Sequence, residues 1–191
     1  MKAYNIELES TTPIIFSRKL ELIDFPKLER EQADAYDLRI WPEKAHYNEV
    51  GSVIVPSVYF KRAMEECAQY TGQQIPGKGK ATYTKHFMSG VQVLGLGIDT
   101  GIKKADVKSV AISCNSDGKR GSGSRVTRRF PTLPTWKGFI QVLVVDEIIT
   151  ESVLRDHLEK AGMFIGIGSF RLRKGNSSGG FKVVSVKETK I

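Results

Sequence analysis

The stretch GIGSFRLRKGNSSGGFKVVSV, residues 166–186, connects a helical pattern to the last strand pattern of the chain. Before it, apolar residues recur at helical spacing over 150–161, where Thr150 can cap the start and Gly162 follows the end. After it, residues 181–186 alternate between apolar and polar, which is typical of a strand. The stretch therefore predicts a helix, a glycine-rich loop and a closing strand in that order.

Two features of the loop bear on function. Gly166 and Gly168 permit backbone conformations that other residues resist, and they allow a ligand backbone to approach closely. If the chain alternates from Phe170 onward, Arg171 and Arg173 share one face. We therefore expect the loop to present positive charge on a single side.

A similar order precedes this segment. Residues 3–9 alternate as a first strand, and Ser57 can cap a helix that runs through Tyr70 with Gly72 as its stop. Helical spacing within it is kept by Phe60, Ala63, Met64 and Cys67. Further strand patterns lie at 53–56, 87–94, 107–113 and 137–146.

The predicted fold class is α+β, a ferredoxin-like or RRM-like core made of two β-α-β halves with inserted loops. We expect a single RRM-like domain over residues 1–191. A polar segment at about 10–50, with a helix near 27–39, is inserted after the first strand, and a long basic loop occupies about 114–130.

The composition describes an ordinary globular protein, with 40% hydrophobic and 26% charged residues in 191. No apolar run approaches the roughly 20 residues of a membrane helix, and the first ten residues do not resemble a signal peptide. Cys67 and Cys114 are too few for a disulfide framework. We expect a cytoplasmic location and no membrane partner.

The net charge of +8 and the pI near 9.5 make a polyanionic partner a reasonable expectation. The basic residues gather in three segments, together with glycines or aromatic residues. Glycines let a backbone come close to phosphates, and aromatic rings offer stacking faces to bases. These segments carry Lys78, Lys80 and Lys85; Lys119, Arg120, Arg125, Arg128 and Arg129; and Arg171, Arg173 and Lys174.

Motifs for other chemistry are incomplete. The sequence GQQIPGKG (72–79) nearly forms a P-loop, but Gly79 stands where a Ser or Thr should hold magnesium. The histidines show no metal-binding spacing, so we predict no metal and no cofactor. His86, beside a basic segment, and His46 are the candidates for a general acid or base in RNA cleavage.

Two stretches together resemble the RAMP superfamily of CRISPR proteins. GSVIVPSVYFKRAMEECA (51–68) is similar to the segment that begins the first helix of that superfamily, although Pro56 to Phe60 replace its small residues. Residues 166–186 resemble its glycine-rich loop and closing strand, although NSSGG lacks the usual Gly-apolar-Gly. The resemblance covers about a third of the chain as motif.

The chain looks most like the backbone subunit of effector complexes, which lines up along guide RNA, and its small size suggests a stand-alone relative such as one carried by a bacteriophage. This resemblance implies that Lys61 and Arg62, after the helix start, contact the nucleic-acid backbone. It implies the same role for Arg171, Arg173 and Lys174 in the loop.

The expected function is binding of single-stranded nucleic acid through phosphate contacts, without strong sequence choice and with side-by-side assembly along the strand. RNA is favoured and DNA is the alternative partner. A metal-independent endoribonuclease and a protein-interaction subunit with an acidic partner are the rival hypotheses. The candidate binding residues are Lys61, Arg62, Lys78, Lys80, Lys85, Lys119, Arg120, Arg125, Arg128, Arg129, Gly166, Gly168, Arg171, Arg173 and Lys174.

Overall fold

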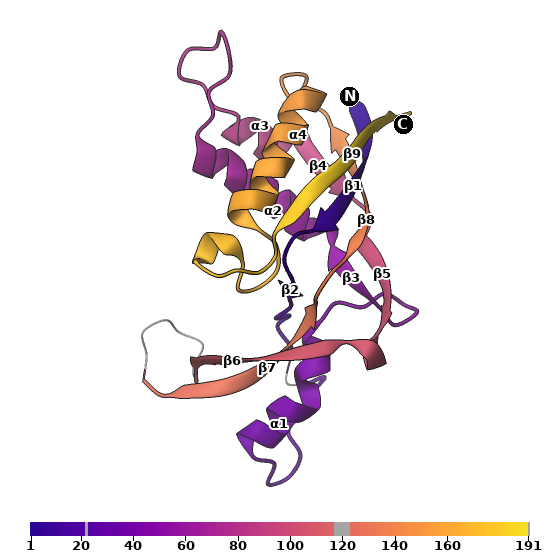
Figure 1. Cartoon of the computed structure of the whole chain (residues 1–191), viewed down its shortest axis with the longest axis vertical. Helices are drawn as coiled ribbons and strands as arrows, with labels where there is room; N and C mark the ends of the chain where they lie inside the picture. Colours follow the sequence, from indigo (N-terminus) through magenta and orange to yellow (C-terminus); the bar gives the residue numbers. More distant parts are fainter. Residues whose placement is uncertain (22, 117–122, 191) are drawn as a thin grey trace.

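A four-stranded antiparallel sheet forms the core of the computed structural model, which describes residues 1–21, 23–116 and 123–190 (Figure 1). Its strand order is β4-β8-β1-β9. The chain runs β1-α2-β4 and then β8-α4-β9, so the two β-α-β halves and the α+β class are confirmed. Their bounds are β1 Lys2–Ser10, α2 Ser57–Thr71, β4 Val91–Leu94, β8 Lys137–Val144, α4 Glu151–Lys160 and β9 Phe181–Thr189.

Both helices cover the same face of this sheet. Alternate residues of β1 and β8 point into the core, including Tyr4, Ile6 and Leu8 of β1. The predicted apolar face of α2 is buried, and the helix ends at Gly72, which adopts the left-handed conformation with φ 54°. In the described part of the chain, no helix is both long and apolar enough to cross a membrane.

The predicted strand over 87–94 is half helical. Helix α3 (Thr84–Gly90) precedes β4, because Phe87 is drawn into the core against the ring of His157, with 4.3 Å between the ring centroids. The Lys61 ammonium donates to the carbonyl oxygens of Phe87 (2.5 Å) and Met88 (2.9 Å), which stabilises the end of this short helix. Only the second half of the apolar run joins the sheet.

The predicted basic loop at about 114–130 is shorter than expected. Strand β7 (Arg125–Leu133) pairs in register with β6 (Lys108–Asn115), so Arg125, Arg128 and Arg129 lie on a strand of a long hairpin. Along β7, the less exposed Val126, Arg128 and Phe130 alternate with the exposed Thr127 and Arg129, as expected for a strand with two different faces. The pairing with β6 therefore makes this segment a strand, although its polar composition is typical of a loop.

The inserted segment at about 10–50 packs on that hairpin. It contains β2 (Ile14–Ile15), which pairs with β7, and α1 (Ala33–Ile40), followed by a 3₁₀ turn (Trp41–Lys44). Lys44 is 9% exposed; its ammonium lies 2.5 Å from Asp37 Oδ1 and 3.0 Å from the Arg129 carbonyl oxygen. Asp37 Oδ2 also accepts from the Arg129 backbone N–H at 2.8 Å. A half-buried ion pair thus fixes the insertion to β7. The chain enters the core from β3 (Ser52–Pro56), which leads directly into α2 and pairs antiparallel with β5 (Gly97–Lys103).

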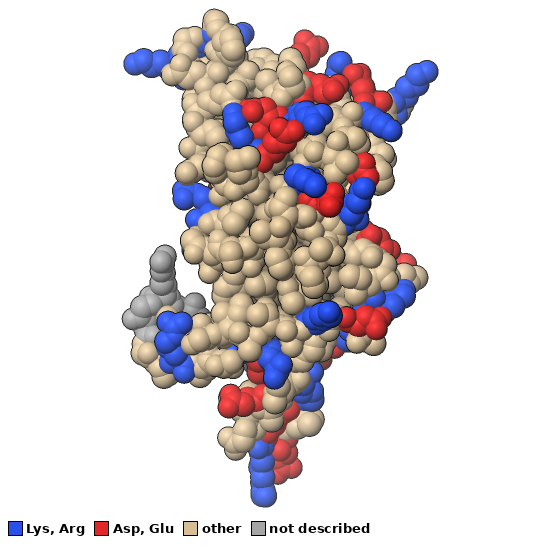
Figure 2. Space-filling view, in the orientation of Figure 1, with Lys and Arg blue, Asp and Glu red and all other residues tan. Residues whose placement is uncertain are grey.

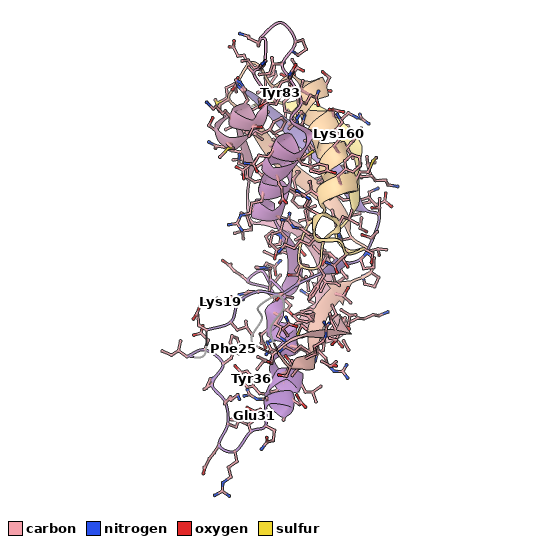
Figure 3. The ribbon with its side chains drawn as sticks, turned by 90° about the vertical axis from the view of Figure 1, so that its left-hand side faces the viewer. Lys19, Phe25, Glu31, Tyr36, Tyr83 and Lys160 are labelled. Atoms are coloured by element: carbon pink, nitrogen blue, oxygen red, sulfur yellow. The ribbon has the colours of Figure 1, made fainter. Side chains whose placement is uncertain are left out.

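Figure 3 shows Phe25, Glu31 and Tyr36 at one end of the elongated molecule and Tyr83 and Lys160 at the other. The Tyr36 hydroxyl donates to the Phe25 carbonyl oxygen (2.7 Å), and Glu31 accepts from Arg39 (2.8 Å). The hydrogen bonds from Arg39 hold the pKa of Glu31 down to about 2. These polar contacts help to fix the conformation of residues 25–39, most of which are not buried.

The glycine-rich loop is a closed structure. Gly166, Gly168 and Gly179 have φ of 71°, 77° and 79°. The Ile167 N–H donates to the Gly179 carbonyl oxygen, and the Ser169 N–H donates to the Ile15 carbonyl oxygen, both at 2.8 Å. A Cβ on Gly179 would lie 1.9 Å from the Ile167 carbonyl oxygen, so the two arms of the loop can meet only without a side chain there.

A pair of alanine substitutions separates backbone strain from close packing in this loop. Gly168 and Gly175 share nearly the same φ, 77° and 76°, but a Cβ on Gly168 meets Ile14 Cγ1 and the Ile15 carbonyl oxygen at 2.8 Å, whereas Gly175 has open space. We expect Gly175→Ala to lower the free energy of unfolding by about 1–2 kcal/mol. Gly168→Ala should lower it by about 2–5 kcal/mol, because overpacking adds to the strain.

Urea unfolding of the two variants and the wild type measures both values. Equal losses in the two variants would show that the loop does not pack against β2 as described.

Candidate nucleic-acid interface

A groove of about 600 Å³ lies between helix α2 and the glycine-rich loop. Five of the residues predicted from the sequence line it together: Arg62, Gly168, Arg171, Arg173 and Lys174. The other lining residues are Tyr59, Glu65, Glu66, Gln69, Tyr70, Met88 and Ile167. The structure therefore brings together the two segments that carried the family resemblance.

One face of α2 forms the first wall. Successive lining residues on this helix are three or four positions apart, except for one adjacent pair, so their side chains share one side of the helix. They are Tyr59, Arg62, Glu66, Gln69 and Tyr70. The opposite side of the helix is buried in the core. Sequence reasoning identified Arg62 alone, although this spacing was visible once the buried face had been assigned.

The loop forms the second wall. Phe170 has a φ of 54°, uncommon for a residue with a Cβ, and its ring packs edge-on against Phe130 of β7 with 5.1 Å between the centroids. Arg171 then bridges to Ser178, and a 3₁₀ turn (Leu172–Lys174) follows. A short helical turn thus replaces the strand-like alternation that was expected from Phe170 onward.

Glu66 nevertheless receives both arginines. Arg171 Nη2 lies 2.6 Å from Glu66 Oε2, and Arg173 Nε lies 3.8 Å from Glu66 Oε1. The side chains of Arg171 and Glu66 are 20% and 31% exposed, so this ion pair is partly screened by solvent. The carboxylate of Glu66, on the α2 wall, thus holds both arginines of the loop toward the groove.

The groove carries a positive surplus. Its lining includes four cationic side chains and two carboxylates, and the second carboxylate, Glu65, is paired with Lys61 at 3.0 Å. Within the described chain, Arg62 and Lys174 have no ion-pair partner. An anion that enters the groove therefore meets two unpaired cations and two arginines shared with Glu66.

Aromatic rings accompany these charges. Tyr70 is 53% exposed; the Arg173 guanidinium lies 4.7 Å from its ring centroid and Phe164 lies 6.2 Å away. Tyr59 is hydrogen-bonded through its hydroxyl to His46 Nε2 at 3.0 Å. Burial raises the pKa of Tyr59 and lowers the pKa of His46, so both groups are neutral near pH 7.

The remaining predicted cations lie elsewhere. Lys61 is committed to the carbonyl oxygens of α3, and Lys85 is exposed on α3. Lys78 and Lys80 are exposed on the loop between α2 and α3. Gly166 is buried and does not line the groove. Lys119 and Arg120 lie outside the described residues.

The three arginines of β7 are bonded across the hairpin. Arg125 donates to the Ser113 hydroxyl and carbonyl, Arg128 to the Ser116 carbonyl, and Arg129 to the Ser109 hydroxyl. Each keeps further donors, because a guanidinium has five N–H groups. Figure 1 shows the ends of β6 and β7, the glycine-rich loop and the loop over 72–83 on the same long side of the molecule, the side that faces the viewer in Figure 3.

In the upper part of the face shown in Figure 2, basic and acidic side chains are mixed, and neither kind forms a patch of its own. A broad uncharged band crosses its middle. On this face, positive charge is therefore mixed with negative charge and is not spread evenly.

The two candidate catalytic histidines occupy different places. His86 Nδ1 lies 2.6 Å from Asp146 Oδ2, and neither residue lines the groove. His46 reaches the groove only through Tyr59. Among the described residues, no three His, Cys, Asp or Glu side chains gather in a way that could hold a metal ion.

The arrangement of elements recurs in solved structures, 36 chains of which match this one. One is a chain of the Type III-B Cmr-beta, determined by cryo-electron microscopy with bound cognate target RNA. The TM-score is 0.56 at 12% sequence identity, and the match covers 99% of this chain and 61% of that chain. This likeness shows the fold. No protein-family model matches the sequence, and the search of curated proteins found no match.

The groove predicts an effect of Glu66 on anion binding. Glu66→Gln removes a negative charge beside Arg171 and Arg173 but keeps a hydrogen-bond acceptor of nearly the same shape. Affinity for a single-stranded oligonucleotide should rise about 3–10-fold, since a charge about 4 Å away contributes about 1 kcal/mol or more in a partly exposed site. Fluorescence anisotropy at fixed salt measures the change.

The control is Glu9→Gln, which removes a carboxylate paired with Lys182 at 3.5 Å outside the groove. An equal gain in both variants would mean that only net charge matters. A loss of affinity in Glu66→Gln would mean that Glu66 is needed to position the arginines.

Proposed function

We propose that this protein binds single-stranded nucleic acid, with RNA as the favoured partner, in the groove between α2 and the glycine-rich loop. The observation that carries the proposal is the convergence of Arg62, Arg171, Arg173 and Lys174 with the exposed ring of Tyr70 in one groove of about 600 Å³. Guanidinium groups recognise phosphates through paired hydrogen bonds, and Tyr70 offers a surface to an unpaired base.

The groove favours phosphates over base edges. Arg171 and Arg173 release part of their interaction with Glu66 when a phosphate takes its place, while Arg62 and Lys174 add charge without losing a partner. Base-stacking contributes affinity for every base, because each base has a π-face. Binding with little sequence preference follows from such contacts.

The path of the strand is part of the proposal. The basic segments on the long side of the molecule (Figure 1) would extend the track beyond the groove, toward Lys78 and Lys80 in one direction and toward β7 in the other. A track that runs along the molecule leaves both ends open to neighbours, which supports side-by-side assembly on a longer strand.

The fold comparison supports RNA as the partner, because the Type III-B Cmr-beta chain belongs to a structure with bound target RNA. Membership in the RAMP superfamily of CRISPR proteins is proposed on the same basis, together with the resemblance of residues 51–68 and 166–186. Parallel titrations with RNA and DNA of the same sequence distinguish the two partners.

The central test is the double variant Arg171→Ala/Arg173→Ala. It should weaken binding of all sequences alike and reduce the slope of log K against log salt by about 1.4, because each phosphate contact on a single strand contributes about 0.7. The fold should change little, since ion pairs that solvent partly screens, as here, contribute about 1 kcal/mol. Thermal unfolding of the same samples checks this.

The matched control is Arg155→Ala/Lys182→Ala, which removes two exposed cations, each near a carboxylate and outside the groove. Its salt slope should equal that of the wild type. A folded Arg171→Ala/Arg173→Ala variant that binds RNA as tightly as the wild type would disprove the groove as the binding site.

Metal-independent cleavage of RNA is the second candidate, and the observation that favours it is the His46–Tyr59 hydrogen bond at the groove wall. We expect labelled RNA to stay intact during incubation with the protein in EDTA, because His46 does not line the groove and its Nε2 is already bonded to the Tyr59 hydroxyl. Cleavage that disappears in His46→Ala, but persists in His86→Ala, would instead establish the enzyme.

A further inference from the structure

A second cavity, of about 310 Å³, lies where β1 begins, β8 ends and α4 begins. It shares no lining residue with the groove, so an inference about it does not depend on nucleic-acid binding. Its lining residues are Met1, Lys2, Tyr4, Val144, Asp146, Glu147, Ile149, Thr150 and Glu151. Its volume is at the lower end of the range for small-ligand sites.

The hydroxyl of Tyr4 is the first unusual feature of this cavity. Tyr4 is 1% exposed, and its hydroxyl has no hydrogen-bond partner among the described residues. Trp136 Nε1 and His157 Nε2 are also buried without a hydrogen-bond partner among the described residues, but neither residue lines this cavity. Buried hydroxyls nearly always have a partner, because an unpaired one lowers stability. A ligand group in the cavity would provide that partner.

The charges at the cavity are the second feature. Lys2 is paired with Glu188 (3.0 Å), and Asp146 is bonded to His86 (2.6 Å). Glu147 and Glu151, by contrast, have no ion-pair partner in the described part of the chain. Met1, which also lines the cavity, brings the α-ammonium group of the chain. The two carboxylates outnumber this one cation, so the cavity keeps a small surplus of negative charge that favours a cation.

The start of α4 does not cancel this surplus. The Thr150 hydroxyl accepts from the Val153 N–H at 3.3 Å, so the end of the helix already has a cap from the protein itself. Glu151 lies in the first turn, where a carboxylate is stabilised in its ionised form.

The third feature is an apolar inner wall. Val144 and Ile149 are 3% and 2% exposed, and both line the cavity. A ligand made only of a small ion would leave this wall unused. An aliphatic chain that carries a charged head matches the wall and the carboxylates at the same time.

We propose that this cavity binds an aliphatic cation, that is, a guanidinium or ammonium group on an alkyl chain. The cationic head donates to the Tyr4 hydroxyl oxygen and to the carboxylates of Glu147 and Glu151, and the chain lies against Val144 and Ile149. A guanidinium suits this site well, because its five donors can serve several acceptors at once. The head belongs either to an arginine side chain of a protein partner or to a free polyamine.

The experiment is thermal unfolding of the full chain in the presence of N-acetyl-arginine amide or spermidine, with sodium chloride at matched ionic strength as the reference. At ten times the dissociation constant, a ligand shifts the folding equilibrium about 11-fold. For a chain of this size that shift corresponds to a rise in Tm of about 3–6 °C. The probe that saturates at the lower concentration identifies the source of the cation.

Variants tie the rise in Tm to this cavity. Tyr4→Phe should leave the Tm of the free protein unchanged or raise it, because the hydroxyl has no partner, and should remove most of the ligand-dependent rise. Glu147→Gln/Glu151→Gln should also remove the rise. Glu159→Gln, on the same helix and paired with Arg155 at 2.9 Å, is the matched control and should keep it.

Three results would overturn the proposal. The first is a Tm that does not rise beyond the sodium chloride reference with either probe. The second is a full rise that persists in Tyr4→Phe, which would assign the effect to general surface charge. The third is a clear loss of stability in ligand-free Tyr4→Phe, which would show that the hydroxyl already has a partner.

Discussion

The glycine-rich loop can close on itself and on β2 only because it lacks side chains at the points of contact. A Cβ at Gly179 would lie 1.9 Å from the Ile167 carbonyl oxygen, and a Cβ at Gly168 would lie 2.8 Å from that of Ile15. Hydrogen bonds from the loop to Ile15, and from Gly179 to the Pro13 carbonyl oxygen, depend on these approaches. Closure then fixes the 3₁₀ turn that carries the arginines toward α2.

Strand β2 connects the closed glycine-rich loop to the inserted elements. It has only two residues, yet it pairs with β7 through Ile14 and Ile15 and bridges to Ser169 of the loop. The Thr132 hydroxyl donates to the Ile14 carbonyl oxygen at 2.9 Å, and Phe130 meets Phe170. The Lys44–Asp37 ion pair holds α1 to β7, the partner of β2. Core, loop, hairpin and insertion are thus joined around β2, and displacement of one of them would disturb the groove.

The sequence predicted the core well, because its helices and strands have clear apolar periodicity and recognisable caps, as Thr150 and Gly72 illustrate. It failed where long-range pairing decides the structure: Arg125 to Arg129 have a polar composition, and only the partner strand β6 makes them a strand. At the site, cations could be identified from composition and resemblance. Glu66 could not, because its importance arises from contact with Arg171, 105 residues away in the chain. The spacing of Tyr59, Arg62 and Tyr70 on α2 was a usable signal that depended on knowing which helix face was buried.

The open face of the sheet explains why a helix-side groove is the better candidate for nucleic acid. RRM domains bind RNA on that face through aromatic residues of the strands. Here Phe139, 54% exposed, is paired across β1 with Glu7, whose pKa is lowered by its hydrogen bond with Lys137. Glu9, in the same row, lies 3.5 Å from Lys182. Ionised carboxylates at the centre of the sheet repel a phosphate backbone, and their lysine partners are already engaged. On the helical side, Arg62 and Lys174 have no such partner among the described residues, so a phosphate there gains attraction without first breaking an ion pair.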